Sequence, residues 1–154
     1  DSSASSTGKD SVSFRFSSTG RNAVEVAKCA SGGEKSRIML SLKAMMARYT
    51  NMPTMIFDEI DTGVSGSIAN CMAQMMIKMA SNHKIQVISI THLPQIAAMG
   101  TTHYQVYKED TSDQTLSHIK ELDKEERIQE IANMLSGAQV SQAAIENAKQ
   151  LLKI

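Results

Sequence analysis

Two carboxylates at the end of an apolar run are the residues best suited to chemistry in this chain. Pro53 to Phe57 is a short apolar run, Asp58 and Glu59 follow it directly, and Asp61 comes two residues later. A run of this length predicts a strand of a parallel sheet that helices bury on both faces. Ligands of such sheets bind beyond the carboxyl ends of the strands. We therefore expect Asp58 and Glu59 at the mouth of a ligand-binding crevice.

The acidic pair suits magnesium-dependent phosphate chemistry. Mg²⁺ prefers oxygen ligands and commonly takes one or two carboxylates together with substrate phosphates and water, which is a role for Asp58. Glu59 is suited to orient and deprotonate a water molecule that attacks a γ-phosphate. The motif taken alone is equally compatible with two carboxylates in an ordinary strand-to-loop turn.

A second candidate is the sequence Ser31-Gly32-Gly33-Glu34. Ser31 with Glu34 forms a capping box, and most such matches do no more than start a helix. The two glycines fall in the first helical turn, where each costs up to ~1 kcal/mol relative to alanine. Glycines at this place let a phosphate approach the free backbone N–H groups and the positive end of the helix dipole. The motif therefore predicts phosphate contact at the start of a helix.

A histidine follows the second predicted strand, Ile85 to Ile90, which leads into Thr91-His92. Lone histidines are more often packed or exposed than functional. A position at the carboxyl end of a strand in the same sheet would place His92 beside the crevice, which favours a functional role. The other histidines show no metal-ligand spacing, and we interpret them as structural or exposed.

The chain as a whole is predicted to be α/β, with a mostly parallel sheet flanked by helices and a peripheral β-hairpin. Residues 1–10 are Ser-rich and are expected to be a flexible lead-in or the remnant of a truncation, with residues 11–154 forming one lobe. The first expected helix carries an apolar stripe of Ile38, Leu42, Met45 and Tyr49. We expect a half-buried strand over 12–16, helices from 31, 67, 123 and 141, and hairpin strands over 104–107 and 116–119.

The composition indicates the class of protein but does not identify a binding partner. The 154 residues suffice for one domain with a real core, and Lys+Arg balance Asp+Glu at 16 each. No basic face is apparent, so if nucleic acid matters, most of its contact surface lies elsewhere. Cys29 and Cys71 lack CxxC spacing and are expected to be buried, reduced thiols. Without a signal peptide or an 18-residue apolar run, we expect a cytoplasmic protein that does not contact the membrane.

The sequence contains no phosphate-binding (Walker A) loop. Residues 6–10, Ser-Thr-Gly-Lys-Asp, are only superficially similar to one: the first glycine is replaced by Ser3, Asp10 stands at the Ser/Thr position, and no strand precedes. The cradle for the β- and γ-phosphates is therefore expected on another stretch of polypeptide.

Four motifs occur in a fixed order: Ser31-Gly32-Gly33-Glu34, the strand into Asp58-Glu59, then Asp61, then Thr91-His92. Together they resemble the C-terminal half of an ABC-type ATPase head, namely its signature motif, Walker B strand, D-loop and switch histidine. Residues 61–66, 91–97 and 127–137 are similar to the RecN family of bacterial DNA repair proteins, in the SMC-like branch of these ATPases.

That resemblance implies a head lobe that uses ATP and Mg²⁺. It implies that Asp58 holds the metal, that Glu59 and His92 are catalytic, and that Ser31, Gly32, Gly33, Glu34 and Asp61 contact nucleotide. It further implies an N-terminal lobe of the same protein that carries the Walker A loop beyond a long coiled coil, a second head in a homodimer, and DNA bound by the assembly. The function implied is ATP hydrolysis in double-strand-break repair and recombination, in the bacterial cytoplasm at the nucleoid.

Two alternatives remain. A transporter's nucleotide-binding domain shares the motifs, but transporters usually have proline after the acidic pair, where this chain has Ile60. A non-catalytic interaction module could keep the fold and bind only a partner, although such a module would not need Asp58, Glu59 and His92 at one crevice.

Overall fold

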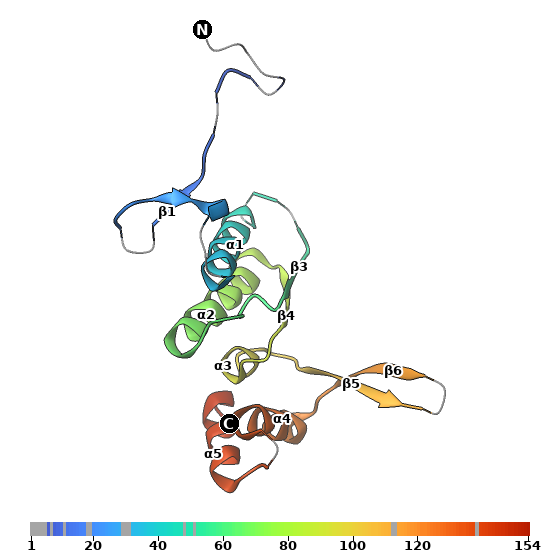
Figure 1. Ribbon diagram of the computed structural model, residues 1–154. Coiled ribbons are helices and arrows are strands. Elements are labelled where there is room, and N and C mark those ends of the chain that lie inside the picture. The colour runs from blue at the N-terminus through green and yellow to red at the C-terminus, as the bar shows by residue number, and fades with distance from the viewer. Residues whose placement is uncertain are drawn as a thin grey trace.

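The computed structural model describes residues 6, 8–10, 12–17, 20–28, 32–47, 49–50, 52–111, 114–137 and 139–154. Strands and helices alternate through the middle of the chain, as the α/β prediction requires (Figure 1). In chain order the elements are β1 (Arg15–Phe16), β2 (Val24–Glu25), the 3₁₀ turn η1 (Val26–Lys28), α1 (Gly32–Met46), β3 (Thr54–Asp58), α2 (Gly66–His83), β4 (Gln86–Ile90), α3 (Pro94–Ala97), β5 (Tyr104–Asp110), β6 (Thr115–Glu121), α4 (Lys124–Ser136) and α5 (Gln142–Leu152).

The centre of the molecule is the parallel pair β3 and β4. The strands are in register from Thr54 opposite Gln86 to Asp58 opposite Ile90. Helix α2 is the crossover between them, as parallel neighbours require. The two remaining pairs in the described part of the chain, β1–β2 and β5–β6, are antiparallel. The parallel part of the sheet therefore has two strands in the described residues.

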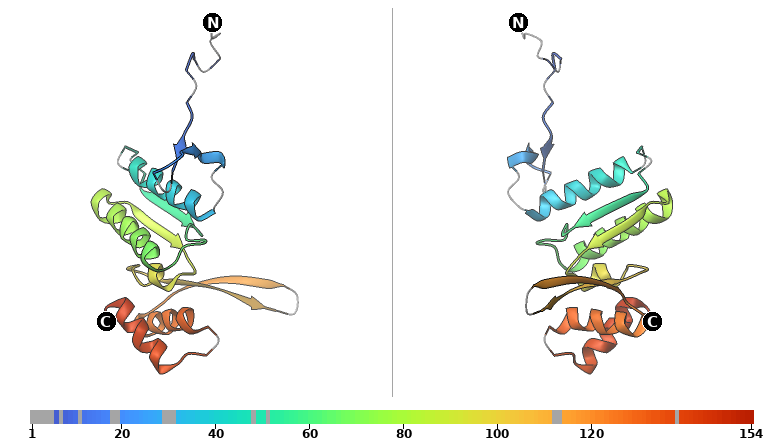
Figure 2. Two further views of the ribbon diagram at one scale, coloured as in Figure 1. Left: turned by 60° about the vertical axis from the view of Figure 1, so that its left-hand side comes forward. Right: turned by 90° about the vertical axis from the view of Figure 1, so that its right-hand side faces the viewer.

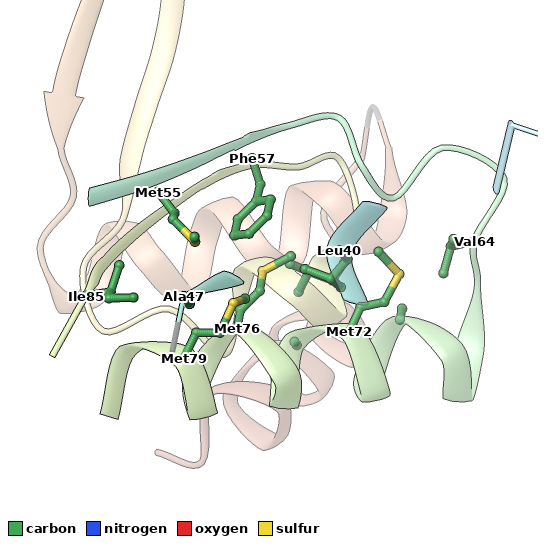
Figure 3. Packing of buried hydrophobic residues seen from close by; sticks show 12 residues of the cluster. Leu40, Ala47, Met55, Phe57, Val64, Met72, Met76, Met79 and Ile85 are labelled. Atoms are coloured by element: carbon green, nitrogen blue, oxygen red, sulfur yellow. The ribbon is translucent and has the colours of Figure 1, made fainter. Parts of the chain in front are cut away.

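Helices α1 and α2 pack against the same face of this pair (Figure 2). Met55 and Phe57 point from β3 toward the helices and are buried (Figure 3). Their buried neighbours include Leu40 on α1, Ala47 directly after α1, and Ala69, Met72, Ala73, Met76 and Met79 on α2. Flexible methionine side chains fill irregular gaps of this kind.

The opposite face of β3 and β4 is uncovered. Side chains alternate along a strand, so Ile56, Ile88 and Ile90 point away from the helices, and their exposed fractions are 58%, 41% and 53%. The prediction that helices bury the Asp58 strand on both faces is therefore wrong for this chain. The apolar sequence of these strands correctly indicates side chains that favour burial, but no described residue of this chain packs on this face.

Two further apolar segments are more exposed than predicted. Leu40 and Ala44 of α1 face the core, together with Ala47 directly after the helix. Leu42 and Met45 of the predicted stripe are exposed, and so is Tyr49, which lies beyond the end of the helix. The predicted strand over 12–16 shortens to β1, and Val12 and Phe14 before it are exposed rather than half-buried.

The C-terminal part is a helix pair joined to a hairpin. Helices α4 and α5 form their own cluster around Ile131 and Ala148. The hairpin β5–β6 extends away from the body (Figures 1 and 2), and its base is attached to α4 by a hydrogen bond from Gln105 to Glu130 (2.8 Å). Helix α4 begins at the predicted Asp123, which forms a capping box with Glu126 in both directions.

The turn before β5 is held by Arg127 of α4. Its guanidinium donates to the carbonyl oxygens of Gly100 (3.0 Å) and Thr101 (3.2 Å). Burial and the adjacent Arg127 charge lower the pKa of His103, which supports our interpretation of this histidine as structural.

Cys71 is exposed on α2, so the prediction of a buried thiol is wrong there, and Cys29 lies outside the described residues. Within the described ranges, no helix combines the length and apolarity needed to cross a membrane.

We expect the isolated chain to self-associate, because its uncovered sheet face is apolar. Replacing Ile56 and Ile88 together by lysine should lower the average mass in light scattering at high protein concentration. The matched control replaces Ile68 and Ile77, which are exposed on α2, by lysine. A monomer at every concentration for the unmodified chain would contradict this expectation.

Candidate functional site

The acidic pair and the histidine come from the carboxyl ends of two paired strands. Asp58 is the last residue of β3 and lies opposite Ile90, the last residue of β4. The pairing continues for one more hydrogen bond, from the Glu59 N–H to the Ile90 carbonyl oxygen (3.2 Å). Asp58 and Glu59 therefore lie at the same edge as the Thr91-His92 segment. The side chains of Asp58, Glu59 and His92 are all exposed there.

Glu59 has a strained backbone. Its φ of +44° lies in the left-handed region, which residues other than glycine rarely adopt. Lys84 and Lys153 share this conformation because they end helices, but Glu59 ends none. The Thr62 hydroxyl donates to the Glu59 carbonyl oxygen (2.9 Å) and stabilises the turn. Such strain costs of the order of 1–3 kcal/mol and concentrates at functional sites.

Asp61 is buried in its own chain. Its side chain is 1% exposed, and Oδ2 accepts a short hydrogen bond from the Thr91 hydroxyl. The Thr91 hydroxyl oxygen in turn accepts from the Leu93 N–H (3.0 Å). The His92 imidazole is exposed, and its Nδ1 lies 3.7 Å from Asp61 Oδ1. This arrangement connects the loop after β3 to the loop after β4.

The start of α1 packs on the loop that contains Asp61. Gly33 is buried, and a Cβ built there would lie 3.3 Å from a guanidinium nitrogen of Arg37 and 3.4 Å from the carbonyl oxygens of both Thr62 and Gly63. A Cβ at Gly32 would meet nothing within 4 Å among the described atoms. Gly33 therefore permits a close backbone approach, whereas Gly32 is exposed. Ser31 lies outside the described residues, and Glu34 is half-buried in the first turn of α1.

The exposed carboxylate of Asp58 is the residue at this edge that could contribute a ligand to Mg²⁺. Asp58 presents one exposed carboxylate, which fits Mg²⁺ because that ion keeps several waters and takes other ligands from phosphates. Among the described residues no three His, Cys, Asp or Glu side chains are grouped to hold a metal by themselves. The residues present fit an ion that arrives with a phosphate ligand, and they do not form a closed protein cage.

Most of the predicted site residues come together here. Asp58, Glu59 and His92 lie at one edge, and Gly33 contacts the loop between Asp61 and α2. Sequence reasoning gave no role to Thr91, which the structure shows bonded to the buried Asp61. The only sequence signal was a hydroxyl residue directly before the histidine.

Comparison with curated proteins finds DNA repair proteins named RecN. The Bacillus subtilis protein is 42% identical over 147 residues, which is 95% of this chain and 25% of that protein. The Deinococcus radiodurans protein is 40% identical over 146 residues, covering 94% of this chain and 25% of that protein. The Vibrio cholerae protein is 38% identical over 146 residues, covering 94% and 26%. The chain thus spans about a quarter of the length of these relatives. No protein-family model matches it.

A solved structure supports the fold. It comes from work on the ATP-driven dimerization and DNA-stimulated activation of SMC ATPases, and it matches with a TM-score of 0.59. The match covers 78% of this chain and 70% of that one at 22% identity. The predicted α/β fold is therefore confirmed.

The contrast between the two glycines predicts a difference in stability. Gly33→Val should lower the free energy of unfolding by about 1–3 kcal/mol more than Gly32→Val, because only the former pushes a side chain against the carbonyl groups of Thr62 and Gly63. Both variants introduce valine into the first turn of α1, so the cost of its lower helix propensity cancels when their stabilities are compared. Denaturant titration of the two proteins side by side measures the difference, and equal stabilities would contradict the close approach.

Proposed function

Because the chain belongs to the RecN family of DNA repair proteins over the stretch it shares with its relatives, we propose that it is the C-terminal lobe of an ATP-hydrolysing head. The lobe would supply the signature motif, Walker B residues, D-loop and switch histidine to an ATP site. The observation that carries the proposal is the register of β3 and β4, which brings Asp58, Glu59 and the His92 segment to one edge.

Each exposed side chain at this edge has a role that fits its chemistry. Asp58 would hold Mg²⁺, directly or through a water, and the bound ion would neutralise charge on the phosphates. Glu59 would orient the attacking water and accept its proton. His92 would contact the γ-phosphate or hold that water, since an imidazole both donates and accepts hydrogen bonds.

The missing phosphate cradle is assigned to an N-terminal lobe of the same protein. The uncovered face of Ile56, Ile88 and Ile90 supports this partner, because it borders Asp58 and is apolar. These three side chains are about half exposed, and fully burying an isoleucine is worth about 1.5–3 kcal/mol, so docking a lobe on this face would add roughly half of that for each of them.

A second head is assigned to the start of α1. Gly32 is exposed there, and Ser31, Gly32, Gly33 and Glu34 would face the ATP of the partner head in a homodimer. Helix N-termini bind phosphate through free N–H groups and the helix dipole. Engagement and release of two heads, driven by ATP, would then act on DNA during double-strand-break repair at the bacterial nucleoid.

In the full-length protein, Glu59→Gln should lower kcat for ATP hydrolysis by about 10²–10⁴-fold, the range for a positioned general base. ATP binding should survive, because the amide keeps the size of the side chain and removes only its ability to accept a proton. Steady-state turnover and nucleotide titration measure the two effects. Glu125→Gln, an exposed site on α4, is the control. Unchanged turnover in Glu59→Gln would remove Glu59 from this role.

The purified 154-residue chain should hydrolyse no ATP, since it lacks the Walker A loop. A phosphate-release assay with and without Mg²⁺ checks this expectation. Robust magnesium-dependent hydrolysis by the chain alone would contradict the assignment of the phosphate cradle to another lobe.

A further inference from the structure

Asp61 combines features that an ordinary loop carboxylate lacks. It is the one charged side chain among the buried residues of the described chain, with an exposed fraction of 1%. A buried carboxylate is costly unless its oxygens accept hydrogen bonds. The Thr91 hydroxyl satisfies Oδ2, but no described residue donates a hydrogen bond to Oδ1.

The group closest to serving Oδ1 is the His92 imidazole. Nδ1 lies 3.7 Å from Oδ1, just beyond hydrogen-bonding distance, and the His92 side chain is 64% exposed. Thr91 brings the two residues together, because it binds Asp61 through its hydroxyl hydrogen and the Leu93 N–H through its hydroxyl oxygen.

We propose that Asp61 is the positioning residue of His92: its Oδ1 accepts a hydrogen bond from His92 Nδ1–H in the assembled ATP site, with Thr91 holding the carboxylate in place. The proposal rests on the ATPase function proposed above. An Nδ1–H fixed in this way leaves Nε2 without a proton and facing out of the loop, so Nε2 accepts from a water or becomes a donor when the ring is charged. Asp61 thereby acts on the nucleotide through His92, since its own oxygens are enclosed by the chain.

The substitution Asp61→Asn tests this arrangement, because it keeps the shape of the side chain and replaces one acceptor oxygen by an N–H₂ donor. With the amide oxygen on Thr91, the amide N–H₂ faces Nδ1 and favours the opposite histidine tautomer. In the full-length protein, Asp61→Asn should lower kcat by about 10–100-fold, as loss of a residue that orients a histidine commonly does, with KM for ATP nearly unchanged. In ¹⁵N-histidine NMR, the signal of His92 is identified as the one that disappears in His92→Ala. In Asp61→Asn this signal should shift to the position of the Nε2–H tautomer.

A double-mutant cycle separates positioning from a general loss of structure. If Asp61 acts through His92, then Asp61→Asn should have little further effect in a His92→Ala background. Thr91→Ser should keep most activity and Thr91→Val should resemble Asp61→Asn, because only serine retains the hydroxyl. Asp110→Asn is the matched control, since Asp110 accepts a hydrogen bond from Thr115 on the exposed hairpin.

The outcomes distinguish this inference from the function on which it rests. If His92→Ala lowers kcat but Asp61→Asn does not, or if the two effects multiply, the positioning role is overturned while the ATPase function stands. An unaltered His92 tautomer in Asp61→Asn would also overturn it. If His92→Ala leaves kcat unchanged, the proposed catalytic role of His92 fails, and the positioning role fails with it.

Discussion

The parallel pairing of β3 and β4 is the constraint on which the rest of the structure depends. Because parallel strands end at the same edge, the register that sets Asp58 opposite Ile90 also places the two following loops side by side. A shift of one residue would turn Met55 and Phe57 away from the helices and Ile56 toward them. Burial of Phe57 among α1 and α2 therefore fixes the geometry of the candidate site as well as the core.

The two loops are then joined by polar contacts. The hydrogen bond from Thr91 to Asp61 connects the segment after β4 with the segment after β3, and the start of α1 packs on that same segment at Gly33. Three sequence motifs separated by long stretches of chain thus meet around one loop. Two places next to this loop are exposed to solvent: the sheet edge that carries Asp58 and Glu59, and Gly32 at the start of α1. Openness at these places is what a composite nucleotide site shared with other polypeptide requires.

Much of this arrangement could be predicted from residue types. The apolar run before Asp58-Glu59 and the one before Thr91-His92 are short and bounded by turns, so both strands and their shared edge follow from general rules. The start of the helix at Asp123 and the hairpin follow from residue types in the same way. The family resemblance rests on the order in which the four motifs occur, and it gave each motif its expected role.

Other features depend on contacts that spacing does not encode. Ile56 and Ile88 are as apolar as core residues, and sequence cannot say whether their cover lies in this chain or outside it. Leu40 rather than Leu42 faces the core, because α1 is apolar on more than one side. The burial of Asp61 and its bond to Thr91 join residues 30 positions apart, and only the fold brings them together.

The central claim is that Asp58, Glu59 and His92 gather around the γ-phosphate of one ATP whose cradle lies on another lobe. The most direct measurement is a structure of the full-length protein with Mg²⁺ and a non-hydrolysable ATP analogue. The account predicts Asp58 coordinating the ion directly or through one water, with Glu59 and His92 beside the γ-phosphate. An analogue bound elsewhere, with these three side chains facing solvent, would contradict it.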